Sequence, residues 1–404
     1  MAANLMTQAF SGIQILDFTQ VFAGPFAVMQ LALLGADVIK IEQPGTGDQT
    51  RGLMNAGNDQ NQSPSFLTMN ANKRSLTLNL KSPEAVNLIK RLIETTDVVV
   101  ENFKAGTMTK LGLDYEALKA LKPDLIYCSI TGYGQSGPKA GEAAYDGAIQ
   151  AASGMMSQNG HIGTGPTRTG FMPVDMATAL STAFAISASL HRKATTGLGQ
   201  HIDSAMLDTA IVMQASQFSN YLNQGQLLGL QGNASPTGQP TANVFPTQDG
   251  FIQITALKQN QVEQLFMALD CSERLQEAAF HDPAQRKQNP EVVNALLCEK
   301  LQGKTTATWM NILPQKGIPT AEVKSIPEVL ADPQLLEREV IEQITPTEAN
   351  ADAIHIIKAG YSTDQDGPTI TRPPPKLGEH THEILRALDL TSKQIETLRS
   401  LGVI

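Results

Sequence analysis

The sequence predicts an α/β protein built on a parallel, doubly wound sheet. Aliphatic and β-branched segments alternate with helical patterns over the first two hundred residues. The first two such segments, 13–18 and 37–42, flank a helix that has Pro25 in its first turn and ends at Gly35. Two strands joined by a helix form a βαβ unit, and repetition of this unit extends a parallel sheet.

The later elements keep the same order. Strands are expected at 76–80, 98–100, 125–130 and 201–203, and a helix begins with Ser82 as its N-cap and Pro83 in its first turn. Further helices are expected at 115–121 and 206–213. No Gly-x-Gly-x-x-Gly follows a strand and no Gly-Lys-Ser/Thr occurs. This Rossmann-like sheet should therefore bind a ligand at its carboxyl edge without a dinucleotide motif.

The chain is expected to form two domains. Residues 1–203 form the first part of a large α/β domain, and a Gln-, Asn- and Gly-rich composition marks 204–242 as a linker. Residues 243–324 are predicted to form a smaller α+β domain, followed by a second linker at 325–345. Residues 346–404 then return to complete the large domain.

Composition excludes several classes of function. The 404 residues are 41% hydrophobic and carry a net charge of −9, which is typical of a globular protein that binds neither nucleic acid nor an anionic membrane. Cys128, Cys271 and Cys298 are too widely spaced for a disulfide framework or a zinc site, so no metal and a reducing compartment are expected. The first ten residues lack a signal-peptide pattern, so we expect a cytoplasmic protein.

Asp175 is the leading candidate for a catalytic group. It lies between apolar neighbours just before 177–190, a run of small and apolar residues long enough for a buried helix. Polar Thr178 and Ser181 and the cationic end 191–193 argue against a membrane span. A helix N-terminus favours an ionised carboxylate. The alternative is an ordinary N-cap aspartate.

The order of motifs resembles the class III CoA-transferases, the family of formyl-CoA transferase, carnitine CoA-transferase and the α-methylacyl-CoA racemases. The matching stretches cover almost the whole chain in family order. They read LDFTQVFAGPFAVMQLALLGADVIKIEQPGTGD, NKRSLTLNLKSPE, VVVENFKAGTMTKLGLDYE, SITGYGQSGP, VDMATAL, TGLGQHIDSAMLD, GIPTAEVKSIPEVLADPQL and PPPKLGEHTHEIL.

The resemblance implies that Asp175 is the catalytic residue and that acyl-CoA is a substrate. It implies CoA contacts at Phe22, Ala23, Gln43, Leu78, Asn79, Leu80, Lys81, Asn102, Phe103, Lys104, Lys110, Glu142, Ala143, Ala144 and Tyr145. The lysines suit CoA phosphates, the alternative for each being a solvated surface charge. Gln43 and Lys110 depart from the arginines of some relatives. Candidate acyl-pocket residues are Gln20, Phe22, Tyr145 and Asn233.

The implied chemistry is transfer of CoA to a carboxylic acid through an aspartyl anhydride and an aspartyl-CoA thioester. Small dicarboxylic acids are the expected acceptors, with Arg168 as a candidate partner for the distal carboxylate or, alternatively, an exposed loop cation. Residues 232–238 stand where relatives have a glycine-rich flap, although a plain linker turn is an equal alternative. The family also implies an interlocked homodimer.

Two other functions remain open. Racemases of the family place a histidine before an aspartate, whereas this chain has Tyr145 before Asp146. A tyrosine, with a reference pKa of about 10, is a poor base at neutral pH, which favours transfer over epimerisation. A non-catalytic CoA-binding protein would keep the CoA contacts but would not need Asp175.

Overall fold

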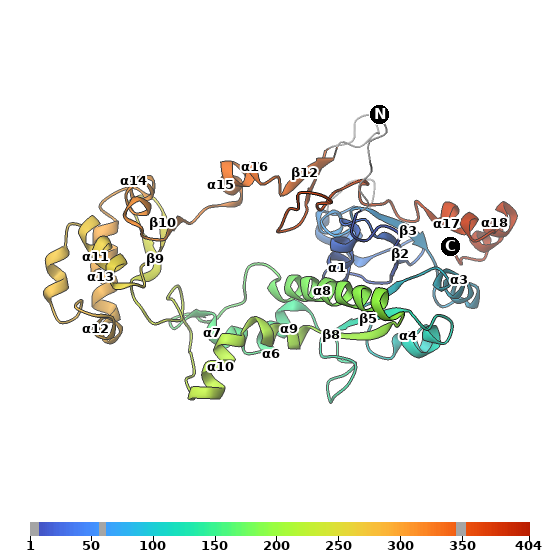
Figure 1. Ribbon diagram of the computed structural model, residues 1–404, viewed down its shortest axis with the longest axis horizontal. Helices are drawn as coiled ribbons and strands as arrows, with labels where there is room; N and C mark the ends of the chain where they lie inside the picture. Colours follow the sequence, from blue (N-terminus) through green and yellow to red (C-terminus); the bar gives the residue numbers. More distant parts are fainter. Residues whose placement is uncertain (1–7, 56–61, 345–352) are drawn as a thin grey trace. The chain divides into compact units, whose positions relative to one another are not determined.

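The computed structural model describes residues 8–55, 62–344 and 353–404 (Figure 1). The chain forms two compact units. The first comprises Met1–Ser153, Thr169–Phe218 and Glu339–Ile404, and the second comprises Gly154–Arg168 and Ser219–Arg338. In the described part of the chain, no helix combines the length and apolar character needed to cross a bilayer.

The first unit contains a six-stranded parallel sheet in the order β3-β2-β1-β4-β5-β8. Its strands are β1 (Gln14–Asp17), β2 (Asp37–Glu42), β3 (Lys73–Thr77), β4 (Val98–Glu101), β5 (Ile126–Thr131) and β8 (Gln200–Ala205). The strand order reverses between β1 and β4, which makes this the switch point of a doubly wound sheet. The predicted α/β class is confirmed.

Helices cover both faces of this sheet (Figure 1). Along β1, Ile15 packs on one face against α1 and α8, and Leu16 packs on the other against α3, α17 and α18. The helices of this unit are α1 (Ala23–Ala32), α2 (Pro64–Leu67), α3 (Pro83–Ile93), α4 (Thr107–Leu111), α5 (Tyr115–Lys119), α6 (Asp146–Ala152), α8 (Pro173–Thr196), α9 (Met206–Met213), α17 (Thr381–Ala387) and α18 (Ser392–Ser400). A hairpin of β12 (Ile341–Ile344) and β13 (Ile354–Ile357) also belongs to it.

Two predicted elements differ from the structure. The strand expected at 76–80 is β3, which begins three residues earlier, at Lys73. A charged residue at this position predicts a loop, but the ammonium of Lys73 is buried and paired with Asp17. Helix α8 begins at Pro173, so Asp175 lies inside its first turn. The helix was expected to be buried, yet Leu180 and Phe184 are 54% and 76% exposed on one face.

The second unit contains an antiparallel sheet in the order β11-β10-β9. Its strands are β9 (Ala242–Pro246), β10 (Phe251–Thr255) and β11 (Thr320–Glu322), and β6 (Gly160–His161) pairs with β7 (Gly165–Pro166). Its helices are α7 (Met155–Gln158), α11 (Gln259–Ala268), α12 (Pro283–Gln288), α13 (Pro290–Leu301), α14 (Thr306–Ile312), α15 (Ile326–Leu330) and α16 (Pro333–Glu337). A core around Phe245, Phe266 and Trp309 holds this unit together. Helix α10 (Ala215–Gln224) spans the junction of the two units in sequence.

Candidate active site

A cavity of about 270 Å³ opens in the first unit at the carboxyl edge of the parallel sheet. The loops after β1 and β4 form two of its walls, as expected at a switch point. Asp175, from the first turn of α8, also lines it. The lining residues are Gln20, Val21, Phe22, Ala23, Gln49, Asn102, Phe103, Lys104, Ala105, Ile130, Thr131, Gly132, Tyr133, Gly141, Glu142, Ala143, Ala144, Tyr145, Asp175 and Met206.

The turn of residues 20–23 is fixed to the loop after β4 by Asn102. The amide N–H of Gln20 donates to Asn102 Oδ1 at 2.8 Å, and Asn102 Nδ2 donates to the carbonyl of Gln20 at 2.7 Å. The residue that follows this turn in α1 must be glycine, because a Cβ at Gly24 would lie 2.4 Å from Thr19 Cβ. The Asn102 amide is therefore used to hold one cavity wall against the other.

The N-terminus of α8 is capped by a residue from another helix. Met172 is the N-cap and makes no side-chain capping bond. Asp146, the first residue of α6, instead accepts the backbone N–H groups of Val174 at 2.8 Å and Asp175 at 3.1 Å. A buried carboxylate thus satisfies donors that a helix start leaves unpaired. Asp175 is not the cap, and sequence analysis did not predict the capping role of Asp146, because its partners lie 28 and 29 residues further along the chain.

Asp175 has an unusual carboxyl group. Burial raises its pKa to about 7, and the charge of Asp146 contributes to the shift. Among the residues that the structure describes, no donor bonds to the carboxyl oxygens of Asp175. A half-buried carboxyl that faces a cavity and titrates near neutrality can act as a nucleophile or as an acid–base group.

Most of the predicted site residues line this one cavity. They are Gln20, Phe22, Ala23, Asn102, Phe103, Lys104, Glu142, Ala143, Ala144, Tyr145 and Asp175. Tyr145 is 65% exposed, and Lys104 is the only lysine among the lining residues. The sequence reasoning did not single out Val21 or Gln49, which lack a distinctive residue pattern.

Other predicted residues lie outside the cavity. Gln43 lines a neighbouring hollow of about 460 Å³ that shares Gln20 and Gln49 with the cavity. Leu78 is 0% exposed within the core, and its backbone N–H donates to the carbonyl of Glu42 at 2.8 Å, so it offers no surface to a ligand. The remaining residues, Asn79, Leu80, Lys81 and Lys110, follow β3 or end α4, and both lysines are exposed.

Three predicted features belong to the second unit. Asn233 and Arg168 are both exposed there. The segment 232–238 begins with a bond within this unit, from Gly232 N–H to the carbonyl of Gly160 at 2.7 Å. As for metals, no group of three or more His, Cys, Asp or Glu within the described ranges is arranged to hold an ion.

The fold is that of an α/β protein with a cavity at the carboxyl edge of its parallel sheet, and Asp175 lines this cavity. The chain belongs to CoA-transferase family III, whose model matches residues 10–381. It is 35% identical to human succinyl-CoA:glutarate CoA-transferase, over 97% of this chain and 89% of that protein. It is 33% identical to the succinyl-CoA:mesaconate CoA-transferase of Haloarcula marismortui, over 96% and 99% of the two chains.

The fold is also that of solved members of the family. A CaiB/BaiF family protein from Brucella suis superposes with a TM-score of 0.85 at 33% identity. The match covers 95% of this chain and all of that one. The predicted family and the predicted CoA-transferase class are therefore confirmed.

Proposed function

We propose that this CoA-transferase moves CoA from an acyl-CoA donor to a small dicarboxylic acid, with Asp175 as the nucleophile. The observation that carries the proposal is the carboxyl of Asp175, which faces the cavity with no hydrogen-bond donor from the described residues. The relatives named for glutarate and mesaconate support a dicarboxylic acceptor.

In the first half of the reaction, a carboxylate oxygen of Asp175 attacks the thioester carbonyl of the donor. The C–S bond breaks, which leaves a mixed anhydride and the CoA thiolate. The thiolate then attacks the aspartyl carbonyl and releases the donor's acid as a carboxylate. Asp175 is left as a thioester of CoA, and neither step needs a proton or a further reactant.

The second half reverses these steps with the acceptor. Its carboxylate attacks the aspartyl thioester, which regenerates an anhydride and the thiolate. Attack of the thiolate on the acceptor's acyl carbon yields the new acyl-CoA and frees Asp175. Anhydrides hydrolyse readily, so the cavity must exclude water during this sequence. We propose residues 232–238 as the covering segment.

CoA would enter along the loops after β1 and β4. Lys104 lines the cavity and can meet a phosphate, and Lys81 and Lys110 offer further exposed cations. We propose Gln20, Phe22, Tyr145 and Asn233 as contacts of the acyl group and the acceptor. Arg168 is the candidate partner of the acceptor's distal carboxylate.

A screen of acid acceptors against acetyl-CoA and succinyl-CoA tests this function. We expect new acyl-CoA with small dicarboxylic acids such as glutarate, and weak activity with monocarboxylic acids of equal length. The same assay should follow α-epimerisation of a branched acyl-CoA. Epimerisation without transfer would contradict the proposal, and so would CoA binding without either activity.

The rate of transfer should depend on pH through Asp175. Only the ionised carboxylate attacks a thioester, and the pKa of this group is raised to about 7. The value of kcat/KM should therefore rise with pH and level off above the pKa, falling by roughly tenfold for each pH unit below it. Initial rates between pH 5 and 9, on protein shown by circular dichroism to stay folded, provide the measurement. A flat profile would exclude this assignment.

We also propose an obligate, interlocked homodimer, in which the second unit of one chain covers Asp175 of its partner. The exposed face of α8 supports this proposal, since Leu180 and Phe184 project from it. Val212 and Met213 of α9 are 71% and 44% exposed and line a hollow beside the same helix. Exposed large apolar side chains on neighbouring helices are typical of an interface.

Sedimentation and dilution experiments test the dimer. The buried interface should far exceed the ~1,600 Å² of a standard complex, so dilution should yield no active monomer. Phe184→Lys should break the dimer and abolish transfer, because it buries an unpaired charge. Leu121→Lys changes another exposed leucine, 52% exposed after α5, and should leave both properties unchanged. A folded, active monomer at assay concentration would refute the proposal.

A further inference from the structure

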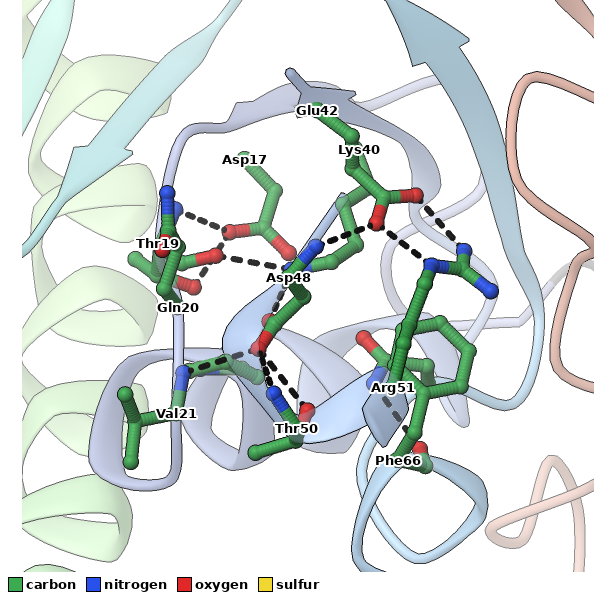
Figure 2. A network of polar contacts seen from close by, with 12 residues as sticks. Asp17, Thr19, Gln20, Val21, Lys40, Glu42, Asp48, Thr50, Arg51 and Phe66 are labelled. Atoms are coloured by element: carbon green, nitrogen blue, oxygen red, sulfur yellow. Dashed lines mark hydrogen bonds and ion pairs between the residues drawn. The ribbon is translucent and has the colours of Figure 1, made fainter. Parts of the chain in front are cut away.

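Two buried ion pairs, Lys40 with Asp48 and Lys73 with Asp17, contact the segment that contains the cavity turn of residues 20–23, and Figure 2 shows Asp17, Lys40 and Asp48 of this set. Lys40 Nζ lies 2.9 Å from Asp48 Oδ2, and Lys73 Nζ lies 2.8 Å from Asp17 Oδ2. None of the four is more than 2% exposed. The free energy needed to remove two charges from water can equal or exceed the attraction between them in the protein. A contribution to stability alone therefore does not explain these buried pairs.

All four charges bond to the segment that forms one wall of the cavity. Asp17 Oδ1 accepts the N–H of Thr19 at 2.9 Å, and Lys40 donates to the carbonyl of Thr19 at 2.7 Å. Lys73 donates to the carbonyl of Pro25 at 2.8 Å, and Asp48 Oδ1 accepts the N–H of Val21 at 3.2 Å. The network therefore bonds to the backbone before the turn, at Thr19, within it, at Val21, and after it, at Pro25.

Val21 is the residue on which these bonds act. Its φ of +70° places a β-branched side chain in the left-handed region, which such residues rarely adopt. A strained residue persists only where its surroundings over-determine it, and such residues gather at functional sites. Here the strained residue lines the cavity that contains Asp175.

The carboxylate of Asp48 is itself held in one orientation (Figure 2). Thr50 donates to its Oδ1 through both the backbone N–H at 2.9 Å and Oγ1 at 2.8 Å. The backbone N–H of Asp48 donates to Glu42 at 3.0 Å, and Arg51 bonds the same carboxylate of Glu42. Burial opposes ionisation of Asp48, but Lys40 and the Thr50 N–H lower its pKa below the ordinary value.

We propose that the Lys40–Asp48 pair is a positioning device for the transfer reaction. It holds Val21 in the left-handed conformation and so fixes the turn 20–23 in the cavity that Asp175 lines. This inference rests on the proposed function. Lys40 and Asp48 do not line the cavity, so they act through the backbone that they hold.

The test replaces the pair by apolar residues, in the double variant Lys40→Met with Asp48→Leu. Apolar replacement of a buried ion pair often preserves folding, whereas removal of one partner leaves an unpaired charge. At temperatures where the variant is folded, we expect kcat/KM to be roughly 10- to 100-fold lower than in the wild type. Small displacements of the cavity wall would misalign the substrate. The control, Asp37→Leu with Arg74→Met, removes a partly exposed ion pair between β2 and β3, and neither residue bonds to the turn. It should keep wild-type kinetics.

A glycine in place of Val21 separates positioning from general stability. Glycine adopts the left-handed region without strain, so the network is less needed when Val21→Gly is present. We therefore expect the same Lys40/Asp48 replacement to cost at least about threefold less in the Val21→Gly background than with valine. An equal loss in both backgrounds, or wild-type kcat/KM in the double variant, would overturn the proposal.

Amide hydrogen exchange gives a readout that does not depend on activity. The peptide covering residues 18–26 should exchange faster in the Lys40/Asp48 variant than in the wild type or the Asp37/Arg74 control. If the wild type transfers CoA to no acid, the proposed function fails, and affinity for CoA then replaces kcat/KM in the same comparison. Unchanged exchange of this peptide would refute the positioning role in either case.

Discussion

Asp175→Asn should abolish CoA transfer while leaving the protein folded. The asparagine keeps the size of the side chain but cannot form the anhydride, so kcat should fall by at least ~10³-fold. The first-turn carboxylate gains from the helix dipole but is half-buried near Asp146, and these effects oppose each other. The pKa raised to about 7 shows that burial outweighs the dipole, so the neutral asparagine should leave the free energy of unfolding at pH 7 unchanged or higher.

The measurement pairs steady-state transfer with thermal unfolding and CoA binding. Glu383→Gln is the control, because Glu383 occupies the first turn of α17 and is exposed. It should transfer CoA at the wild-type rate. If Asp175→Asn keeps its rate within tenfold of the wild type, Asp175 is not the nucleophile, and its role in the cavity is limited to binding.

A covalent intermediate should be trapped on a single peptide. Incubation with acyl-CoA followed by hydroxylamine should convert the activated aspartyl group to a hydroxamate, and borohydride should reduce the aspartyl thioester. Trypsin cleaves after Arg168 and Arg192, and Asp175 is the only acidic residue between them. A mass change on the peptide 169–192 therefore identifies Asp175 without fragmentation.

The controls make this experiment decisive. Asp175→Asn should give no labelled peptide, and Glu383→Gln should label like the wild type. The peptide 140–168 carries Glu142, which lines the cavity, and Asp146, which caps α8. Label on that peptide would transfer the nucleophile role to one of them, and absence of label under both trapping conditions would argue against covalent catalysis.

Much of the fold follows from local patterns in the sequence. Continuous aliphatic runs such as 98–100 predict strands buried on both faces, and the alternation with helices predicts a parallel sheet. Because parallel strands end at one edge, the sequence also places Gln20 and Asn102 close together. Family motifs single out Asp175. These inferences need only short-range periodicity and the connection rules of βαβ units.

The buried charges show where local patterns end. Lys73 and Arg74 read as a loop before a strand, yet β3 begins at Lys73 because Asp17 neutralises the buried ammonium. In the same way, Asp146 reads as the start of its own helix, whereas its carboxylate caps α8. In each case the partner is distant in sequence, and a hydrogen bond between distant segments leaves no periodic signal.

The sequence by itself determined the class of fold, the family and the aspartate at the start of α8. Only the tertiary structure decided that Asp146 caps this helix, that the Asn102 side chain bonds to the backbone of Gln20, and that Asp48 accepts the N–H of Val21. Patterns of hydrophobicity report which residues are buried. The pairing of buried polar groups depends instead on which atoms the folded chain brings within hydrogen-bonding distance.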